Sequence, residues 1–340
     1  GNMSVQTLTA LNYDIFTFAK EGMTGTRFFS IGRNNIPTGS TTWDSPGFHA
    51  NGSIVRRRAS DGNDTTFRTP APALSTIIPN ISYNNFTDVN HYRGVNGSLN
   101  TNTLTHTAKG LSLGGHIFGN NRNGTATSSS ILPGDDDAGF IGHLGETIIY
   151  GSGNLTTEER RRVDSYLAIK YGITLVQVNT DHYLDADAAI VWNGGTNTTF
   201  NNNIFGVARE DIGLFEQKVS KSVNSGTILT IATTNDFVNS NQDAARAGLA
   251  SDKTYFLLGD NNVTAIAPVN IGTSTNQRIQ RIWMTQEKDA DAGELFFEAD
   301  LTAYNSGSFN TTVDMVMLVA DDATFTTNVI VVNPTSSNAS

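Results

Sequence analysis

IGHLGETIIYGSGNLTTEERRRVDSYLAIKYGITL, residues 141–175, carries the strongest helix signal in a chain that otherwise reads as strands and loops. Thr156 precedes Glu159 by three residues, which is the spacing of a capping box at a helix start. Apolar residues then recur at helical spacing: Val163, Tyr166, Leu167 and Tyr171. Gly172 follows at the position where glycine commonly ends a helix. The sequence therefore predicts one short helix near residues 156–171.

The composition favours short strands joined by polar loops. Only 16% of the 340 residues are charged, and 32 are glycine, a profile that a helical bundle would not give. Residues 294–301 alternate between apolar and acidic, as a strand with one solvated face does. Residues 313–320 are nearly continuously apolar, which is typical of a strand covered on both faces. We expect an all-β protein of two β-sandwich domains, residues 1–175 and 176–340.

Charge and cysteine content exclude several classes of protein. The net charge of -10 and the pI near 5.0 argue against nucleic-acid binding, which requires clustered Lys and Arg. The one tight basic run, Arg160 to Arg162, is interpreted as a solvated helix face. The absence of cysteine excludes disulfides, thiolate metal sites and cysteine nucleophiles. No apolar run approaches the ~20 residues of a membrane-spanning helix, so membrane insertion is not expected.

The central stretch resembles the closing segment of concanavalin A-like (laminin-G-like) lectin domains in large secreted proteins of Bacteroidota. The resemblance rests on a final strand and on the end of the helix that follows it: Gly145, Glu146, Ile148, Ile149, Tyr150, then Tyr166, Leu167, Lys170, Tyr171, Gly172 and Ile173. The second half resembles the uncharacterised β-rich domain that commonly follows this lectin domain, in four stretches: residues 203–211, 217–223, 258–261 and 281–283.

The resemblance implies a concanavalin A-like jelly roll for the first domain and a location outside the cell or on its outer surface. Relatives of this kind look like adhesins exported by the type IX route. The family supplies no catalytic residues to transfer to this chain. Because no signal peptide is recognisable and both ends differ from a complete module, we expect an excised piece of a larger polypeptide, truncated in its second domain.

Three adjacent carboxylates, Asp135, Asp136 and Asp137, form a candidate calcium site. Like charges at this spacing repel unless a cation or solvent lies between them, and calcium takes several oxygen ligands. The alternative is a solvated acidic loop, because the spacing is not that of an EF-hand. Further acidic turns near Asp61, Asp185 and Asp289 are interpreted as ordinary Asx turns.

An aromatic and polar group of residues in the loop-rich region 37–52 forms a candidate glycan site: Trp43, Asp44, Phe48 and His49. Sugar rings stack on aromatic faces, while Asp and His side chains bond their hydroxyl groups. The alternative is that Trp43 and Phe48 close one end of the sandwich. Trp192 and Trp283 lie within strand patterns and are expected in the core.

The sequence holds little sign of enzyme chemistry. Glu294 and Glu298 are too widely spaced for the alternating acids of concanavalin A-like glycosidases and are read as a solvated strand face. The histidines show no HxxxH or HxH pair that would hold zinc: His49, His91, His106, His116, His143 and His182. No nucleophile elbow and no phosphate-binding glycine loop is present. We expect no enzymatic activity.

The first hypothesis is a non-catalytic, extracellular or cell-surface adhesin segment whose first domain binds a glycan or another ligand on a host or neighbouring cell. A second hypothesis is a structural stalk or surface-fibre unit that self-assembles with flanking domains or neighbouring chains by strand addition. A third is an accessory binding module of a polysaccharide-degrading enzyme. Calcium is the only cofactor that the sequence suggests.

Overall fold

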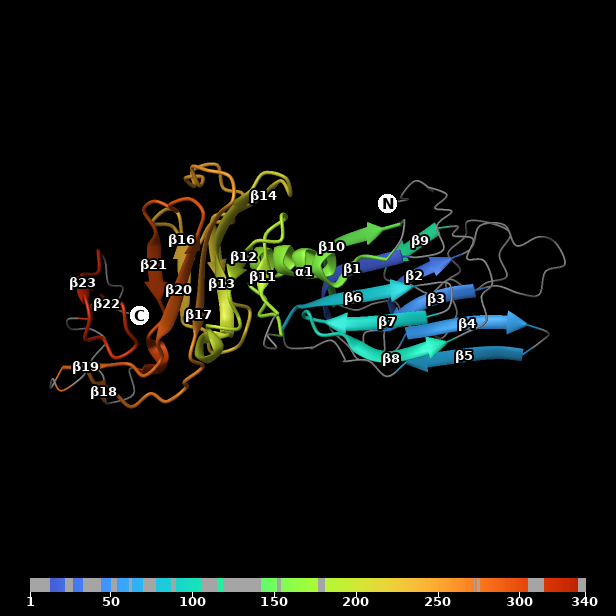
Figure 1. Cartoon of the computed structure of the whole chain (residues 1–340), viewed down its shortest axis with the longest axis horizontal. Coiled ribbons are helices and arrows are strands. Elements are labelled where there is room, and N and C mark those ends of the chain that lie inside the picture. The colour runs from blue at the N-terminus through green and yellow to red at the C-terminus, as the bar shows by residue number, and fades with distance from the viewer. Residues whose placement is uncertain are drawn as a thin grey trace. The chain divides into compact units, whose positions relative to one another are not determined.

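The computed structural model describes residues 13–21, 27–32, 44–49, 54–60, 63–69, 78–86, 90–105, 115–118, 142–151, 154–176, 181–271, 273, 276–304 and 315–335. The chain divides into two compact units, Gly1–Ala168 and Ile169–Ser340. Antiparallel sheets dominate both units, and α1, Thr157–Tyr171, is the one α-helix of the described part (Figure 1). The predicted all-β class and its short helix are therefore confirmed, while the domain limits of 1–175 and 176–340 stay a prediction.

The first unit contains two five-stranded antiparallel sheets. One has the strand order β10-β1-β6-β7-β8, and the other has the order β5-β4-β3-β2-β9. The strands are β1 Tyr13–Glu21, β2 Arg27–Gly32, β3 Asp44–His49, β4 Ile54–Ser60, β5 Asn63–Thr69, β6 Asn80–Phe86, β7 Asn90–Val95, β8 Asn100–Thr105, β9 Gly115–Phe118 and β10 Gly142–Tyr150. Strand β1 lies between β10 and β6 in its sheet, and its apolar residues Ile15, Phe16 and Ala19 are buried.

Strand β3, Asp44–His49, corrects the prediction that region 37–52 is loop-rich. Ser45, Pro46 and Gly47 read as a turn in the sequence, yet they lie in β3, between β2 and β4. Pro46 is opposite Arg56 of β4, whereas the pairing with β2 ends at Gly47. Proline cannot donate to a strand ladder, and here it lies where β3 has no partner in β2. The sequence Ser45-Pro46-Gly47, which is typical of a turn, therefore forms part of a strand here.

Helix α1 begins and ends as its sequence predicts. The backbone N–H of Thr156 donates to Glu159 Oε2 at 2.8 Å, and the Glu159 N–H donates to Thr156 Oγ1 at 3.2 Å, so the capping box forms. These bonds hold the pKa of Glu159 below its usual value, chiefly through the Thr156 backbone. Gly172 has φ +64°, the left-handed conformation of a glycine that ends a helix. Tyr166 donates to Glu146 of β10 at 3.0 Å, which ties the helix to the last strand of its sheet.

The interpretation of Arg160 to Arg162 as a solvated face is wrong for two of the three residues. Arg160 and Arg161 are buried, and the guanidinium of Arg160 lies 5.3 Å from the centre of the Tyr83 ring. Long basic side chains can bury their aliphatic stems while the charge contacts an aromatic face. Arg162 remains partly exposed and pairs with Glu158 at 3.7 Å.

The second unit is a sandwich of a four-stranded sheet, β14-β13-β17-β20, and a three-stranded sheet, β15-β16-β21. Phe205 and Leu258 from the first sheet meet Leu229 and Ile231 from the second in one buried cluster, against which Trp283 packs. Trp192 is fully buried, which confirms its expected place in the core, whereas Trp283 is half-buried and packs against the core cluster. Three two-stranded sheets complete the described part of the unit: β11-β12, β18-β19 and β22-β23.

The elements of the second unit have these bounds: β11 Tyr183–Leu184, β12 Ile190–Trp192, η1 Thr198–Phe200, β13 Asn202–Glu210, β14 Phe215–Gln217, β15 Val219–Lys221, β16 Leu229–Ala232, β17 Thr254–Asp260, β18 Val269–Asn270, β19 Gln277–Arg278, β20 Trp283–Lys288, β21 Phe296–Ala299, η2 Thr302–Tyr304, β22 Met317–Val319 and β23 Ile330–Val332. Strand β22 corrects the expectation for residues 313–320, because Met317 and Val319 are exposed rather than covered. No helix in the described residues is long and apolar enough to span a membrane.

Candidate functional site

The predicted glycan residues lie largely on one strand rather than on a loop. Asp44, Phe48 and His49 belong to β3, the middle strand of its sheet. Their register partners are Arg58 for Asp44, Phe29 and Ile54 for Phe48, and Arg27 for His49. Trp43 directly precedes the strand and lies outside the described residues. The structure thus brings three of the four residues together on one strand, and their role in binding stays a prediction.

The candidate calcium residues Asp135, Asp136 and Asp137 lie outside the described residues. Two of the other acidic turns lie within the described residues. Asp185 Oδ1 accepts the N–H groups of Asp187 and Ala189 at 2.9 and 2.8 Å, and Asp291 Oδ1 accepts that of Gly293 at 2.8 Å. These carboxylates cap their own turns, as predicted. Across the described ranges, no three His, Cys, Asp or Glu side chains are grouped so that they could hold a metal ion.

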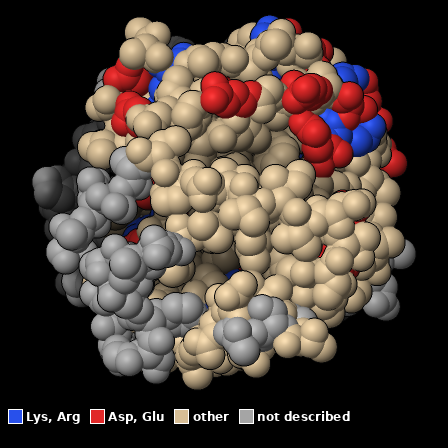
Figure 2. All heavy atoms as spheres, turned by 90° about the vertical axis from the view of Figure 1, so that its left-hand side faces the viewer, with Lys and Arg blue, Asp and Glu red and all other residues tan. Residues whose placement is uncertain are grey.

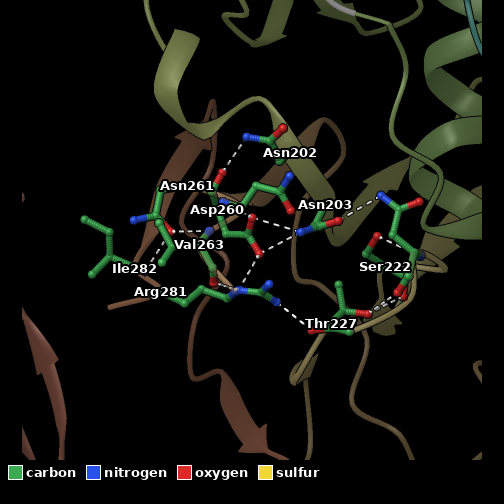
Figure 3. Close-up of polar contacts among 12 residues, drawn as sticks. Asn202, Asn203, Ser222, Thr227, Asp260, Asn261, Val263, Arg281 and Ile282 are labelled. Carbon is green, nitrogen blue, oxygen red and sulfur yellow. Dashed lines mark hydrogen bonds and ion pairs between the residues drawn. The ribbon is translucent and has the colours of Figure 1, made fainter. Parts of the chain in front are cut away.

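The most developed polar cluster of the described chain surrounds Asp260 at the end of β17. Figure 3 shows Asn203 and Arg281 directed at its carboxylate from two other segments. The Asn203 amide donates to both carboxylate oxygens at 2.9 Å, and the Asn262 N–H donates to Oδ1 at 2.8 Å. Arg281 Nε lies 3.7 Å from Oδ2. Both charged side chains of this pair are almost completely buried, and each is held by several polar neighbours.

A β-bulge explains how Asn203 reaches the carboxylate. The register between β13 and β17 shifts between Asn202 and Phe205, and Asn203 adopts φ +53° within this irregularity. Bulges redirect a side chain, and asparagine tolerates the left-handed conformation better than most residues. The same side chain accepts a hydrogen bond from Asn224 at 2.9 Å through its Oδ1. Asn203 therefore links Asp260 to the turn that contains Asn224.

This turn, residues 222–227, is held from two sides. Asn224 Nδ2 also donates to Thr174 Oγ1 at 3.2 Å, on the segment that follows α1. On the other side, Arg281 Nη1 donates to the carbonyl of Gly226 at 2.6 Å. Within the turn, Thr227 Oγ1 donates to the carbonyl of Asn224 at 2.7 Å. The cluster thus joins segments from residue 174 to residue 281 and leaves the Asp260 carboxylate enclosed.

A second enclosed carboxylate in this unit belongs to Glu210, at the end of β13. Its Oε2 accepts the hydroxyl of Tyr255 at 2.8 Å, and its Oε1 accepts the N–H of Ala186 at 2.8 Å. Burial and the adjacent negative charge raise the pKa of Tyr255 well above its usual value. The tyrosine therefore stays protonated and acts as a fixed donor.

In the first unit, Asp14 is enclosed in a similar way. Asp14 Oδ1 accepts the Tyr83 hydroxyl at 2.6 Å and Asn85 Nδ2 at 2.7 Å, while Oδ2 accepts the Leu155 N–H at 2.8 Å. These bonds join β1, β6 and the segment before α1. Asp14, Glu210 and Asp260 were not singled out as site residues in the sequence, because their partners lie far away along the chain.

Comparison with known families gives one match, to a model described as "Domain of unknown function (DUF8202)", over residues 159–340. This range includes the four stretches that carry the sequence resemblance of the second half. No curated protein matches the chain.

Several solved structures are similar to parts of the chain. A heptameric SAP-like pentraxin from Limulus polyphemus has 18% identity and a TM-score of 0.32, with 48% of this chain and 74% of the pentraxin covered. The CBM40 of a Ruminococcus gnavus IT-sialidase, bound to α2,3-sialyllactose, has 18% identity and a TM-score of 0.32, with 44% and 81% covered. Domains LG4-5 of mouse laminin α1 have 10% identity and a TM-score of 0.31, with 86% and 67% covered.

Proposed function

The chain belongs to the family described as "Domain of unknown function (DUF8202)" over residues 159–340, and from this premise we propose that it is a non-catalytic segment of an extracellular or outer cell-surface adhesin. Its first unit binds a glycan. Its second unit is a rigid domain that displays or spaces the first.

The enclosure of Asp14, Glu210 and Asp260 carries the non-catalytic part of this proposal. A general acid or base must reach the substrate and exchange a proton with it. Each of these carboxylates is buried and accepts two or more hydrogen bonds from neighbouring side chains and backbone groups. Their geometry suits the cross-linking of strands and loops, not proton transfer to a bound sugar.

The glycan-binding part of the proposal rests on the residues at and before β3. An indole, a phenyl ring, a carboxylate and an imidazole occur within seven positions of the sequence, from Trp43 to His49. This combination offers both stacking surface and polar partners for sugar hydroxyl groups. We assign the stacking role to Trp43 and the polar roles to Asp44 and His49.

A glycan array with the full chain tests this assignment. We expect binding to a restricted set of glycans, and we expect Trp43→Ala to weaken it at least tenfold, the order of a lost stacking contact. Ile212→Ala is the control, because Ile212 is an exposed apolar residue of the second unit. Retained thermal stability of both variants would show that folding is unaffected. Absence of glycan binding, or equal binding by Trp43→Ala, would reject the assignment.

Calcium belongs to the same proposal through Asp135, Asp136 and Asp137. If these carboxylates bind the ion, calcium titration by calorimetry should give a signal that Asp136→Asn removes. The control is Asp291→Asn, because Asp291 caps its own turn. A signal that survives Asp136→Asn would place the ion elsewhere, and no signal with the unmodified chain would reject a calcium site.

A further inference from the structure

The hairpin of β22 and β23 stands apart from the two packed sheets of the second unit. Its strands pair antiparallel, with Met317 opposite Val332, Leu318 opposite Val331 and Val319 opposite Ile330. Among the residues that the structure describes, neither strand pairs with a third one. The outer edges of the hairpin therefore present backbone donors and acceptors to which another strand could bind.

Both faces of this hairpin are apolar. Cross-strand partners share a face, so Met317, Val319, Ile330 and Val332 lie on one face and Leu318 and Val331 lie on the other. Leu318 is half-buried, but all three residues of β23 are exposed: Ile330 to 60%, Val331 to 56% and Val332 to 41%. A two-stranded hairpin is marginally stable in water by itself. Exposed apolar residues in such a number usually mark a contact surface.

The charges near the hairpin indicate what kind of partner fits it. Its strands contain no charged residue, and its only described charges, Asp321 and Asp322, lie in the connecting turn. Asp322 accepts hydrogen bonds from the Thr324 hydroxyl group and from the N–H groups of Thr326 and Thr327, and these bonds, chiefly that of the Thr324 hydroxyl, hold its pKa below the usual range. Figure 2 shows the side of the molecule on which β22 and β23 lie, and uncharged residues fill its centre while acidic and basic ones gather toward its upper edge.

Two copies of this chain can meet at such a surface although each carries a net charge of -10. Contact through strands without carboxylates avoids repulsion between like charges. An antiparallel, two-fold arrangement also places the two acidic turns at opposite ends of the contact, whereas a parallel one would bring them together. A two-fold contact uses the same patch on both copies.

We propose that β23 is a homotypic docking strand, which pairs antiparallel with β23 of a second copy and joins two hairpins into one four-stranded sheet. Strand β23 is the docking edge because all its residues are exposed, whereas Leu318 in the middle of β22 is half-buried. The two-fold axis passes beside Val331, the central residue of Ile330–Val332. This inference is independent of glycan binding, which concerns the first unit.

Sedimentation of the full chain over a range of concentrations tests the proposal. We expect the mass to rise with concentration from 36.5 kDa toward twice that value. Val331→Lys should weaken association at least tenfold, since an edge lysine opposes strand pairing. Val238→Lys is the matched control, because Val238 is a valine exposed to 95% on a loop of the same unit. A monomer at all concentrations, or a dimer equally weakened by both variants, would overturn the proposal.

Cross-linking gives a second test that does not depend on the lysine variant folding. The chain contains no cysteine, so Val331→Cys introduces a single thiol. Opposed residues of antiparallel strands have Cα atoms ~4.5–5.5 Å apart, within the range that a disulfide spans. Mild oxidation should convert Val331→Cys to a covalent dimer at least tenfold faster than Val238→Cys. Equal rates for the two variants would place the contact elsewhere or show that it does not exist.

Discussion

The hydroxyl group of Tyr83 lies 2.6 Å from the carboxylate of Asp14 and donates a hydrogen bond to it inside the first unit. The Tyr83 ring also lies beneath the guanidinium of Arg160, 5.3 Å from the ring centre. One side chain on β6 therefore contacts both β1 and the first turn of α1. This contact explains why an arginine near the start of the helix is buried.

Replacement of Tyr83 by phenylalanine should destabilise the first unit by about 1.5–3 kcal/mol, the range for a hydrogen bond to a charged group. Asp14 would keep its bonds to Asn85 and to the Leu155 N–H. Urea unfolding measures the change. Tyr150→Phe is the control, because Tyr150 is partly exposed, and it should alter the free energy of unfolding by less than about 0.5 kcal/mol. Equal losses in both variants would contradict the role assigned to the Asp14 bond.

Alkaline pH should weaken the fold through two tyrosines. Burial raises the pKa of Tyr83, and burial with the charge of Glu210 raises that of Tyr255. The pKa of each tyrosine in the folded protein exceeds the unfolded value of about 10. The free energy of unfolding therefore keeps its full value below about pH 10 and falls as the pH rises above about 10. Each tyrosine contributes a slope of up to about 1.4 kcal/mol per pH unit. Urea unfolding from pH 9 to 11 should show this decline, and the Tyr83→Phe/Tyr255→Phe variant should reduce it.

Replacement of Arg281 should lower the free energy of unfolding far more than replacement of one residue of an exposed ion pair. Arg281→Met leaves the buried carboxylate of Asp260 without its cation, and such a change typically costs about 3–5 kcal/mol. The matched control is Asp289→Asn, which removes the exposed pair with Lys288 and should cost less than about 1 kcal/mol. Chemical unfolding of both variants gives the comparison. Similar values for the two would mean that the Asp260 cluster does not hold the second unit together.

Substitutions at Gly172 and Gly226 distinguish the cost of backbone strain from the cost of a steric clash. A Cβ atom on Gly172 would lie 2.2 Å from the carbonyl oxygen of Lys221, whereas one on Gly226 would meet nothing within 4 Å. Both residues have positive φ, at +64° and +78°. Gly226→Ala should therefore cost about 1 kcal/mol from backbone strain alone, and Gly172→Ala should cost at least about 1 kcal/mol more. If thermal unfolding gave equal losses, the close approach of Gly172 to Lys221 would be unimportant.

Local signals in the sequence predicted local structure well. Thr156, Glu159 and Gly172 set the helix limits through bonds and backbone geometry that span a few residues, and the structure has the helix there. The turn signal around Pro46 failed because strand pairing depends on distant partners, in this case Arg56 of β4. Similarly, a run of apolar residues near Met317 predicts a strand but does not say which elements cover it.

The polar clusters could not be predicted because their members are brought together only by folding. Asn203 and Asp260 are 57 residues apart, and Tyr83 lies 69 residues from Asp14. The resemblance of the second half marked the stretches around Asn203, Asp260 and Arg281, and the structure shows that they meet. These three stretches meet at the carboxylate of Asp260, and no spacing of residues along the sequence predicts such a meeting.

The enclosure of the Asp260 cluster has a consequence for the salinity that the second unit can tolerate. Dissolved ions screen charges that face water, with a Debye length of about 8–10 Å near physiological ionic strength. The Asp260 and Arg281 side chains are almost wholly withdrawn from water, and most of their neighbours in the cluster are neutral amides and hydroxyl groups. Salt should therefore change the contribution of this cluster to stability far less than that of an exposed ion pair such as Lys288–Asp289.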